Sequence, residues 1–331
     1  MRCRCGSCRV SIDLHRAPPW RFDTPEARRA LFRWWLRDPL HGLQDWLPHQ
    51  AFRLLPTSVT SAVGARLGAR QVAGRPGPSA TARETLRLLR PDIGEAEAER
   101  LVRAHWIHLG RTFAEFSVLH RLWREGRIEV AGREHLDAAI ASGRPLVVAG
   151  IHVGSWEALH VGLGALGIRF SGIYQRLPNR FRMRIADSAR LRSQRINGPG
   201  VPLAPTLGAV FEAHRLLESR EAALLTYVDE FVGGRVHAPL LGRPLRVEGN
   251  IARAVRLASQ TGAAVLPCYA LRLGEEARFR LTFLPEVPVG TPDRGRMGIK
   301  ADIAALDAAI EGVVRAHPEQ WFMLHAFRAD R

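Results

Sequence analysis

The sequence predicts an α/β fold, with a largely parallel central sheet flanked by helices and a helical N-terminal part in front of it. Between residues 82 and 123, apolar side chains recur every three or four positions, which is the spacing of an amphipathic helix. After Gly126 the period changes, and short apolar runs alternate with helical stretches. Such alternation is typical of parallel strands joined by helical crossovers.

The elements of this core follow from their patterns. Six apolar runs predict strands, at residues 127–130, 146–151, 169–174, 223–229, 264–271 and 278–284. Between and after them, amphipathic stretches predict helices at residues 208–220, 250–262 and 302–317. We divide the chain into a partly mobile N-terminal extension (1–45), a helical part (46–125) and the α/β core (126–331). Within the helical part, the Gly- and Pro-rich stretch 71–82 is the clearest break.

Composition limits the classes of partner. The chain has 331 residues, of which 46% are hydrophobic, and a formal net charge of +16. A positive field attracts nucleic acid, anionic lipid or an acidic carrier protein. A nucleic-acid-binding protein would explain the charge, but the sequence lacks a recognition helix, an RNA-binding signature and zinc-finger spacing. We therefore expect no nucleic-acid partner.

The cysteines indicate neither disulfides nor a metal. Cys3, Cys5 and Cys8 crowd the N-terminus, far from Cys268. This distribution gives no paired framework, and a closed zinc site needs four ligands where only three are local. We expect a tail without a metal ion and a reducing compartment.

Two N-terminal segments have the composition of a membrane interface. Residues 31–47 and 51–69 mix tryptophan, leucine and phenylalanine with arginine, but they are too polar to span a bilayer. No secretory signal precedes them. The alternative is an ordinary helical hairpin packed on the core.

Polar side chains follow the expected strands where ligands bind in parallel sheets. His152 ends one strand, Arg176 follows the next, and Asp229 follows a third. Ser155 is a candidate N-cap that places Glu157 in the first turn of a helix. If His152 lies in a loop, it can fold back to the Glu157 carboxylate, which would orient the imidazole as a general base for a hydroxyl.

An arginine-rich run follows this edge of the sheet. Seven arginines stand between Arg176 and Arg195, against the single acid Asp187. Such a run is either a solvated helix face or a surface for lipid phosphates or an acidic carrier. We expect Arg190 and Arg192, as well as Arg176, to contact the substrate.

The stretch "HVGSWE" resembles the H-x-x-x-x-[D/E] box of glycerolipid acyltransferases, and its Gly154 and Trp156 resemble the late lauroyl/myristoyl acyltransferases of bacterial lipid A biosynthesis. The similarity continues in the same order over roughly residues 47–328, including the closing "HPEQWFMLH". By this resemblance, His152 matches the base and Glu157 the carboxylate of the box. Arg176, Asp229 and Gly154 match substrate-binding positions.

The resemblance implies transfer of an acyl chain from acyl-carrier protein or acyl-CoA to a lipid hydroxyl, without cofactor or metal. It implies a peripheral or monotopic protein at the cytoplasmic face of the inner membrane, on an anionic surface. A lipid A precursor is the expected acceptor, and a lysophospholipid, glycolipid or aminolipid is the alternative. Ser155 stands where this branch usually has asparagine, and Phe231 where many members have an acid. These departures leave the acceptor open, and a non-enzymatic basic lipid-binding relative is the remaining alternative.

Overall fold

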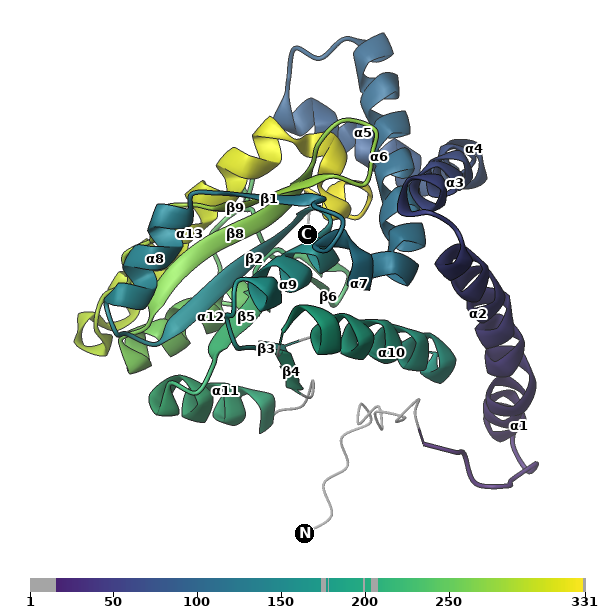
Figure 1. Cartoon of the computed structure of the whole chain (residues 1–331), viewed down its shortest axis with the longest axis horizontal. Coiled ribbons are helices and arrows are strands. Elements are labelled where there is room, and N and C mark those ends of the chain that lie inside the picture. Colours follow the sequence, from purple (N-terminus) through teal and green to yellow (C-terminus); the bar gives the residue numbers. More distant parts are fainter. Residues whose placement is uncertain (1–15, 174–176, 178, 199, 204–207, 330–331) are drawn as a thin grey trace.

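The computed structural model describes residues 16–173, 177, 179–198, 200–203 and 208–329. Its central sheet has seven strands, which are β1 (Ile128–Ala131), β2 (Leu146–Gly154), β3 (Phe170–Ile173), β4 (Gly200–Leu203), β5 (Ala223–Tyr227), β8 (Ala264–Arg272) and β9 (Phe279–Phe283). They lie in the order β1-β9-β8-β2-β5-β3-β4 (Figure 1). All neighbouring pairs are parallel except β8 and β9. The predicted α/β class with a largely parallel sheet is confirmed.

Each of the six predicted apolar runs forms a strand, whereas three short strands escaped prediction. β4 contains Pro202, which a sheet tolerates at an edge, and β4 is an edge strand. The other two, β6 (Phe231–Val232) and β7 (Arg235–Val236), form a hairpin through Gly233 and Gly234. Both glycines have positive φ, as a tight hairpin turn requires. Strands of two residues are too short to show a period in sequence.

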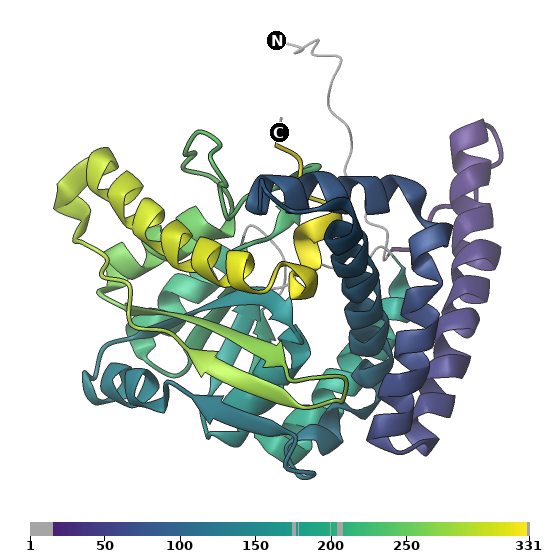
Figure 2. The same cartoon turned by 90° about the horizontal axis from the view of Figure 1, so that it is seen from above.

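Helices cover both faces of the sheet (Figures 1 and 2). The helices of the core are α8 (Arg133–Ala141), α9 (Trp156–Ala165), α10 (Arg180–Asn197), α11 (Gly208–Ser219), α12 (Gly249–Thr261) and α13 (Gly295–Ala316). Alternating residues of β2 divide between two buried clusters. Val147 packs with α12 and α13, whereas Val148 packs with α8 and α9. A strand buried on both faces explains the continuous apolar run.

The N-terminal part is helical, as predicted. It comprises α1 (Pro25–Phe32), a π-helical turn (Arg33–Arg37), α2 (Asp38–Leu54), α3 (Thr57–Ala69), α4 (Gln71–Gly74), α5 (Pro76–Leu89), α6 (Glu95–Glu115) and α7 (Leu119–Leu122). α2 runs through the boundary that we drew at residue 45, and α1 and α2 stand at the outer edge of the molecule (Figures 1 and 2). At the predicted break, only Arg75 separates α4 from α5, because Pro76 begins the second helix at a position where its missing N–H costs nothing.

The two candidate membrane segments have different surroundings. α3 packs closely on α6: a Cβ atom at Gly68 would lie 2.2 Å from the Trp106 carbonyl oxygen. α2 instead leaves large apolar side chains exposed, among them Leu40, Leu43 and Leu47. The hairpin alternative therefore describes α3, whereas α2 packs on α10 at Gly42 and keeps an exposed apolar face. In the part of the chain that the structure describes, no helix is both long and apolar enough to cross a bilayer.

Candidate active site

His152 and Asp229 meet because β2 and β5 are parallel neighbours. In their register, Gly150 lies opposite Tyr227, so His152 and Asp229 each stand two residues further along. His152 Nδ1 lies 2.8 Å from Asp229 Oδ1. The backbone N–H of His152 donates to Asp229 Oδ2 at 3.0 Å, so the carboxylate holds both the ring and the main chain.

Asp229 is fully buried and accepts a third hydrogen bond. The indole Nε1–H of Trp321 donates to Asp229 Oδ2 at 2.9 Å. A carboxylate accepts only, so the imidazole carries its proton on Nδ1 toward Asp229. No described residue hydrogen-bonds His152 Nε2, and His152 is part of a pocket wall. The lone pair of Nε2 is therefore free to take a proton from a hydroxyl group.

The structure corrects the predicted pairing of His152 with Glu157. β2 continues through Gly154, and Ser155 caps α9 directly after it, with its side chain accepting from the Ala158 N–H. No loop remains in which His152 can fold back, so the strand presents the imidazole to Asp229 instead. Glu157 Oε1 lies 2.5 Å from Arg190 Nη2, and Oε2 lies 3.1 Å from His160 Nδ1. The N-cap prediction itself is confirmed.

A buried polar network connects Glu157 to the ring beneath His152. Tyr227 stacks on His152 with ring centroids 4.1 Å apart, and its hydroxyl donates to the Trp156 carbonyl at 2.7 Å. The same hydroxyl lies 3.3 Å from His160 Nε2. Burial raises the pKa of Glu157, but the Arg190 guanidinium and His160 outweigh it and hold the pKa well below its usual range. Glu157 is therefore an ionised carboxylate that ties α9 to α10.

His152 faces a cavity of about 730 Å³. Its walls are mostly apolar and include Phe113, Trp156, Val161, Phe170, Leu225 and Phe322. A cluster beside His152 supplies polar groups: Glu230 accepts from the Asn250 N–H at 2.6 Å and lies 3.8 Å from Arg253 Nη1. Burial raises the pKa of Glu230. The cavity thus joins a general base, a polar patch and an apolar enclosure for an alkyl chain.

Comparison with known proteins identifies the family. The model of the bacterial lipid A biosynthesis acyltransferases matches residues 44–327, which include both residues of the His152–Asp229 pair. The chain belongs to this family. The match confirms the resemblance found in the sequence and supports an enzyme that transfers acyl groups.

Two curated proteins are also similar to the chain. They are named phosphatidylinositol mannoside acyltransferase and come from the ATCC 25618 / H37Rv and CDC 1551 / Oshkosh strains of Mycobacterium tuberculosis. Each is 28% identical over 198 residues, which cover 59% of this chain and 58% of the relative. The chain therefore matches less than two thirds of their length.

The other residues predicted for the site do not all lie at the His152 cavity. Arg190 lines the His152 cavity, but Arg192 lines a separate groove between α2 and α10. Gly154 has φ +70°, and a Cβ atom there would lie 2.0 Å from the Ala270 carbonyl oxygen, so this glycine permits β2 to approach β8. Arg176 lies outside the described residues, as do Cys3, Cys5 and Cys8.

Sequence reasoning missed the parts played by Trp321 and Tyr227. In the sequence, the apolar surroundings of Trp321 are typical of a core residue in a C-terminal strand. It is fully buried, but it follows a short 3₁₀ helix (Pro318–Gln320), makes an isolated bridge to Val153 and holds Asp229. Trp321 lies in the stretch "HPEQWFMLH", which is part of the resemblance to this family, and that was the signal for its role.

Proposed function

We propose that the chain transfers a fatty acyl group from an acyl thioester to a hydroxyl of a membrane glycolipid. The observation that carries this proposal is the His152–Asp229 pair, whose Nε2 lone pair faces a largely apolar cavity. Family membership supports the reaction type. Among the described residues, no serine or cysteine hydrogen-bonds the His152 ring, so direct transfer is the simplest route.

In this reaction, His152 Nε2 accepts the hydroxyl proton while the oxygen attacks the thioester carbonyl carbon. An ester C–O bond forms, the C–S bond breaks, and the imidazolium returns the proton to the thiolate. Asp229 stabilises the imidazolium by its hydrogen bond to Nδ1. The products are an acylated lipid and a free thiol, so the step needs no metal, nucleotide or oxidant.

Glu157 and Arg190 act as positioning residues in this proposal. Their ion pair lies between α9 and α10, and His160 links it to Tyr227, on which His152 stacks. Arg190 also lines the cavity. Asp229 becomes the orienting carboxylate, and Arg176 remains a predicted contact for an acceptor phosphate.

The acceptor is a glycolipid in this proposal. The expected lipid A precursor and the mannosides in the relatives' name are both sugar lipids that bear phosphate. The polar patch of Glu230, Asn250 and Arg253 beside His152 suits sugar hydroxyls and phosphate, and the apolar walls suit the incoming chain. The donor is acyl-carrier protein or acyl-CoA.

A membrane face completes the proposal. Seven exposed apolar side chains follow the helical spacing along α1, the π-helical turn and α2: Phe32, Trp35, Leu36, Leu40, Leu43, Trp46 and Leu47. Arg33 and Arg37 flank them, as in helices that lie in a bilayer interface. We place this surface on the anionic cytoplasmic leaflet of the inner membrane.

Comparative lipid mass spectrometry tests the proposal. A deletion strain should lack one acyl group on one glycolipid class, and the wild-type gene should restore it whereas His152→Gln should not. Loss from phospholipids alone would reject the glycolipid acceptor. Restoration by the His152→Gln variant, or an unchanged lipid profile, would reject the reaction and favour a protein that only binds lipid.

A further inference from the structure

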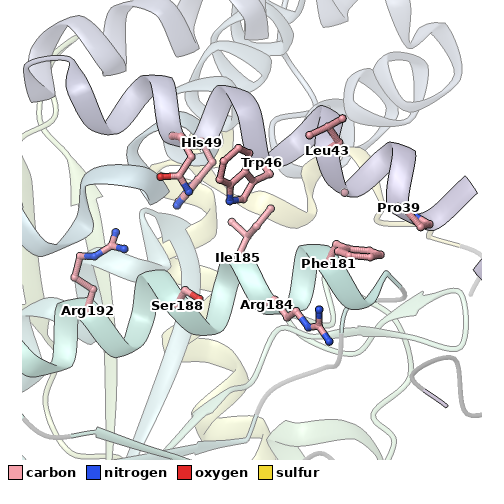
Figure 3. A pocket seen from close by; sticks show the side chains of 11 residues that line it. Pro39, Leu43, Trp46, His49, Phe181, Arg184, Ile185, Ser188 and Arg192 are labelled. Carbon is pink, nitrogen blue, oxygen red and sulfur yellow. The ribbon is translucent and has the colours of Figure 1, made fainter. Parts of the chain in front are cut away.

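A second hollow lies between α2 and α10, which we call the α2–α10 groove. It has a volume of about 460 Å³. Leu43 and Trp46 of α2 face Phe181 and Ile185 of α10 across it (Figure 3). Leu43 and Trp46 also belong to the exposed apolar surface of α2. The groove therefore opens onto the surface that we assign to the membrane, and a lipid can enter it sideways.

Arg192 makes one end of the groove cationic, with His49 beside it, and the opposite end holds Phe181 and the exposed Arg184 (Figure 3). His49 Nδ1 lies 2.9 Å from the Ser117 hydroxyl, but Nη1 of Arg192 is buried and has no hydrogen-bond partner among the described residues. The nearby Arg53 has a buried Nε in the same condition. A buried donor without a partner costs free energy, so an acceptor bound at this end of the groove would be stabilising.

The positive charges around Arg192 also favour an anion at this end of the groove. Burial, Arg53 and Arg192 lower the pKa of His49 to about 4, and burial and Arg53 lower that of Arg192. Three other arginines of α10 have acidic partners: Arg180 faces Asp38, Arg182 pairs with Asp45 and Arg190 pairs with Glu157. A bound anion would relieve the repulsion between Arg53 and Arg192 at this end of the groove.

The groove is separate from the His152 cavity. Phe181, Ser188 and Arg192 line the groove, whereas Arg190 and Gln194 line the cavity. Residues two apart on a helix point about 200° away from each other, so the two hollows lie on opposite sides of α10. A ligand in the groove therefore does not occupy the active site.

We propose that the α2–α10 groove binds one anionic phospholipid of the bilayer, with its phosphate at Arg192 and Arg53 and an acyl chain along Leu43, Trp46 and Ile185. The site is distinct from the sites for donor and acceptor. It seats α2 and α10 together on the membrane, because the lipid contacts both helices. A phospholipid fits better than a free anion, since the cationic end continues into an apolar slot open to the bilayer.

Equilibrium binding of dihexanoyl phosphatidylglycerol, a soluble phospholipid, to the purified full chain tests this site. We expect one lipid per chain and at least about 10-fold weaker binding in Arg192→Gln, because charge-assisted hydrogen bonds are lost. Arg195→Gln removes the same charge from an exposed position of the same helix and should change affinity less than about 2-fold, as a screened surface charge does. Ser188→Trp fills the groove from an exposed position and should abolish binding while every charge stays.

Two further measurements separate the proposal from its rivals. His152→Gln should bind the lipid like the wild type, so loss of acyl transfer and loss of this site are distinguishable. Arg192→Gln should melt at the same or a higher temperature without lipid, since it removes repulsion. Equal losses in Arg192→Gln and Arg195→Gln, or normal binding in Ser188→Trp, would overturn the proposal. Displacement of the lipid by coenzyme A, dependent on Arg192, would assign the groove to the donor and overturn it as well.

Discussion

Asp229→Asn changes one atom of the proposed catalytic pair. Oδ2 of Asp229 accepts from two N–H groups, the His152 backbone and the Trp321 indole. In the variant, the amide oxygen must take this position, because an NH₂ group there would face two donors. The amide NH₂ then faces His152 Nδ1 at the place where Oδ1 lay, 2.8 Å away. Nδ1 must accept, so the ring proton moves to Nε2.

A ring protonated at Nε2 cannot accept the hydroxyl proton there. We expect the rate of acyl transfer to fall by about 10²- to 10⁴-fold, the usual contribution of a general base. This loss corresponds to about 3 to 5 kcal/mol of transition-state stabilisation. Folding should survive, because the amide has the shape of the carboxyl group and keeps both hydrogen bonds at the Oδ2 position.

The assay is acyl transfer from a labelled thioester to a glycolipid acceptor, with product measured by mass spectrometry. Asp307→Asn is the matched control: Asp307 is also buried, accepts from a backbone N–H (Leu240), and burial raises its pKa to about 6. It should keep wild-type turnover. If a folded Asp229→Asn enzyme turns over within a few-fold of the control, Asp229 does not set the tautomer of the base and the reasoning fails.

Three further outcomes follow from the structure. Glu157→Gln removes the carboxylate that pairs with the partly buried Arg190 guanidinium and should cost about 3 kcal/mol of unfolding free energy. The double variant Glu157→Gln/Arg190→Gln should restore part of this loss, and full stability of the single variant would contradict the prediction. Burial lowers the pKa of His105 well below 6.5, so its contribution to stability is complete above pH 6.5 and is lost as the pH falls. Between pH 7 and 5, His105→Gln should therefore lose about 2 kcal/mol less unfolding free energy than the wild type, measured by urea denaturation at both pH values, and equal losses would contradict this. The double variant Trp35→Ser/Leu47→Ser should bind anionic vesicles at least about 10-fold more weakly than the wild type in a sedimentation assay. The control Met297→Ser, at an exposed position of α13, should bind like the wild type. Equal binding by the double variant and the wild type would remove α2 from the membrane face.

Local patterns were sufficient for most of the fold. β2, β5 and β8 are buried on both faces, so their apolar runs are continuous and short, and α12 is amphipathic because one side covers the sheet. The edge strand β4 has four residues, and β6 and β7 have two each, so these strands are too short to give such a signal.

The site was predicted in part. The position of His152 at the carboxyl end of a strand followed from the sequence, but its partner did not. Glu157 is five residues away in the chain, whereas Asp229 is 77 residues away and becomes the neighbour only because β5 lies next to β2. Trp321 comes from still further along the chain. Which strands lie side by side is a tertiary property, and no spacing within one motif contains it.

The arginine run shows the same limit. In sequence, Arg180, Arg182, Arg190 and Arg192 form one basic stretch. In the structure, these arginines have different surroundings. Arg180 and Arg182 lie next to acids of α2, whereas Arg190 pairs with Glu157. Arg192 lines the α2–α10 groove. Whether an arginine is paired depends on the helix that packs against it, which the charge count does not report.

The most direct test of the central claim is single-turnover acyl transfer by wild type and His152→Gln, with thioester and glycolipid both saturating. Saturation removes binding from the comparison and leaves the proton-transfer step. We predict that the wild type forms the ester and releases one thiol per acyl group transferred, and that the folded His152→Gln variant is slower by at least about 10²-fold. Equal rates in the two proteins would contradict a general base at His152.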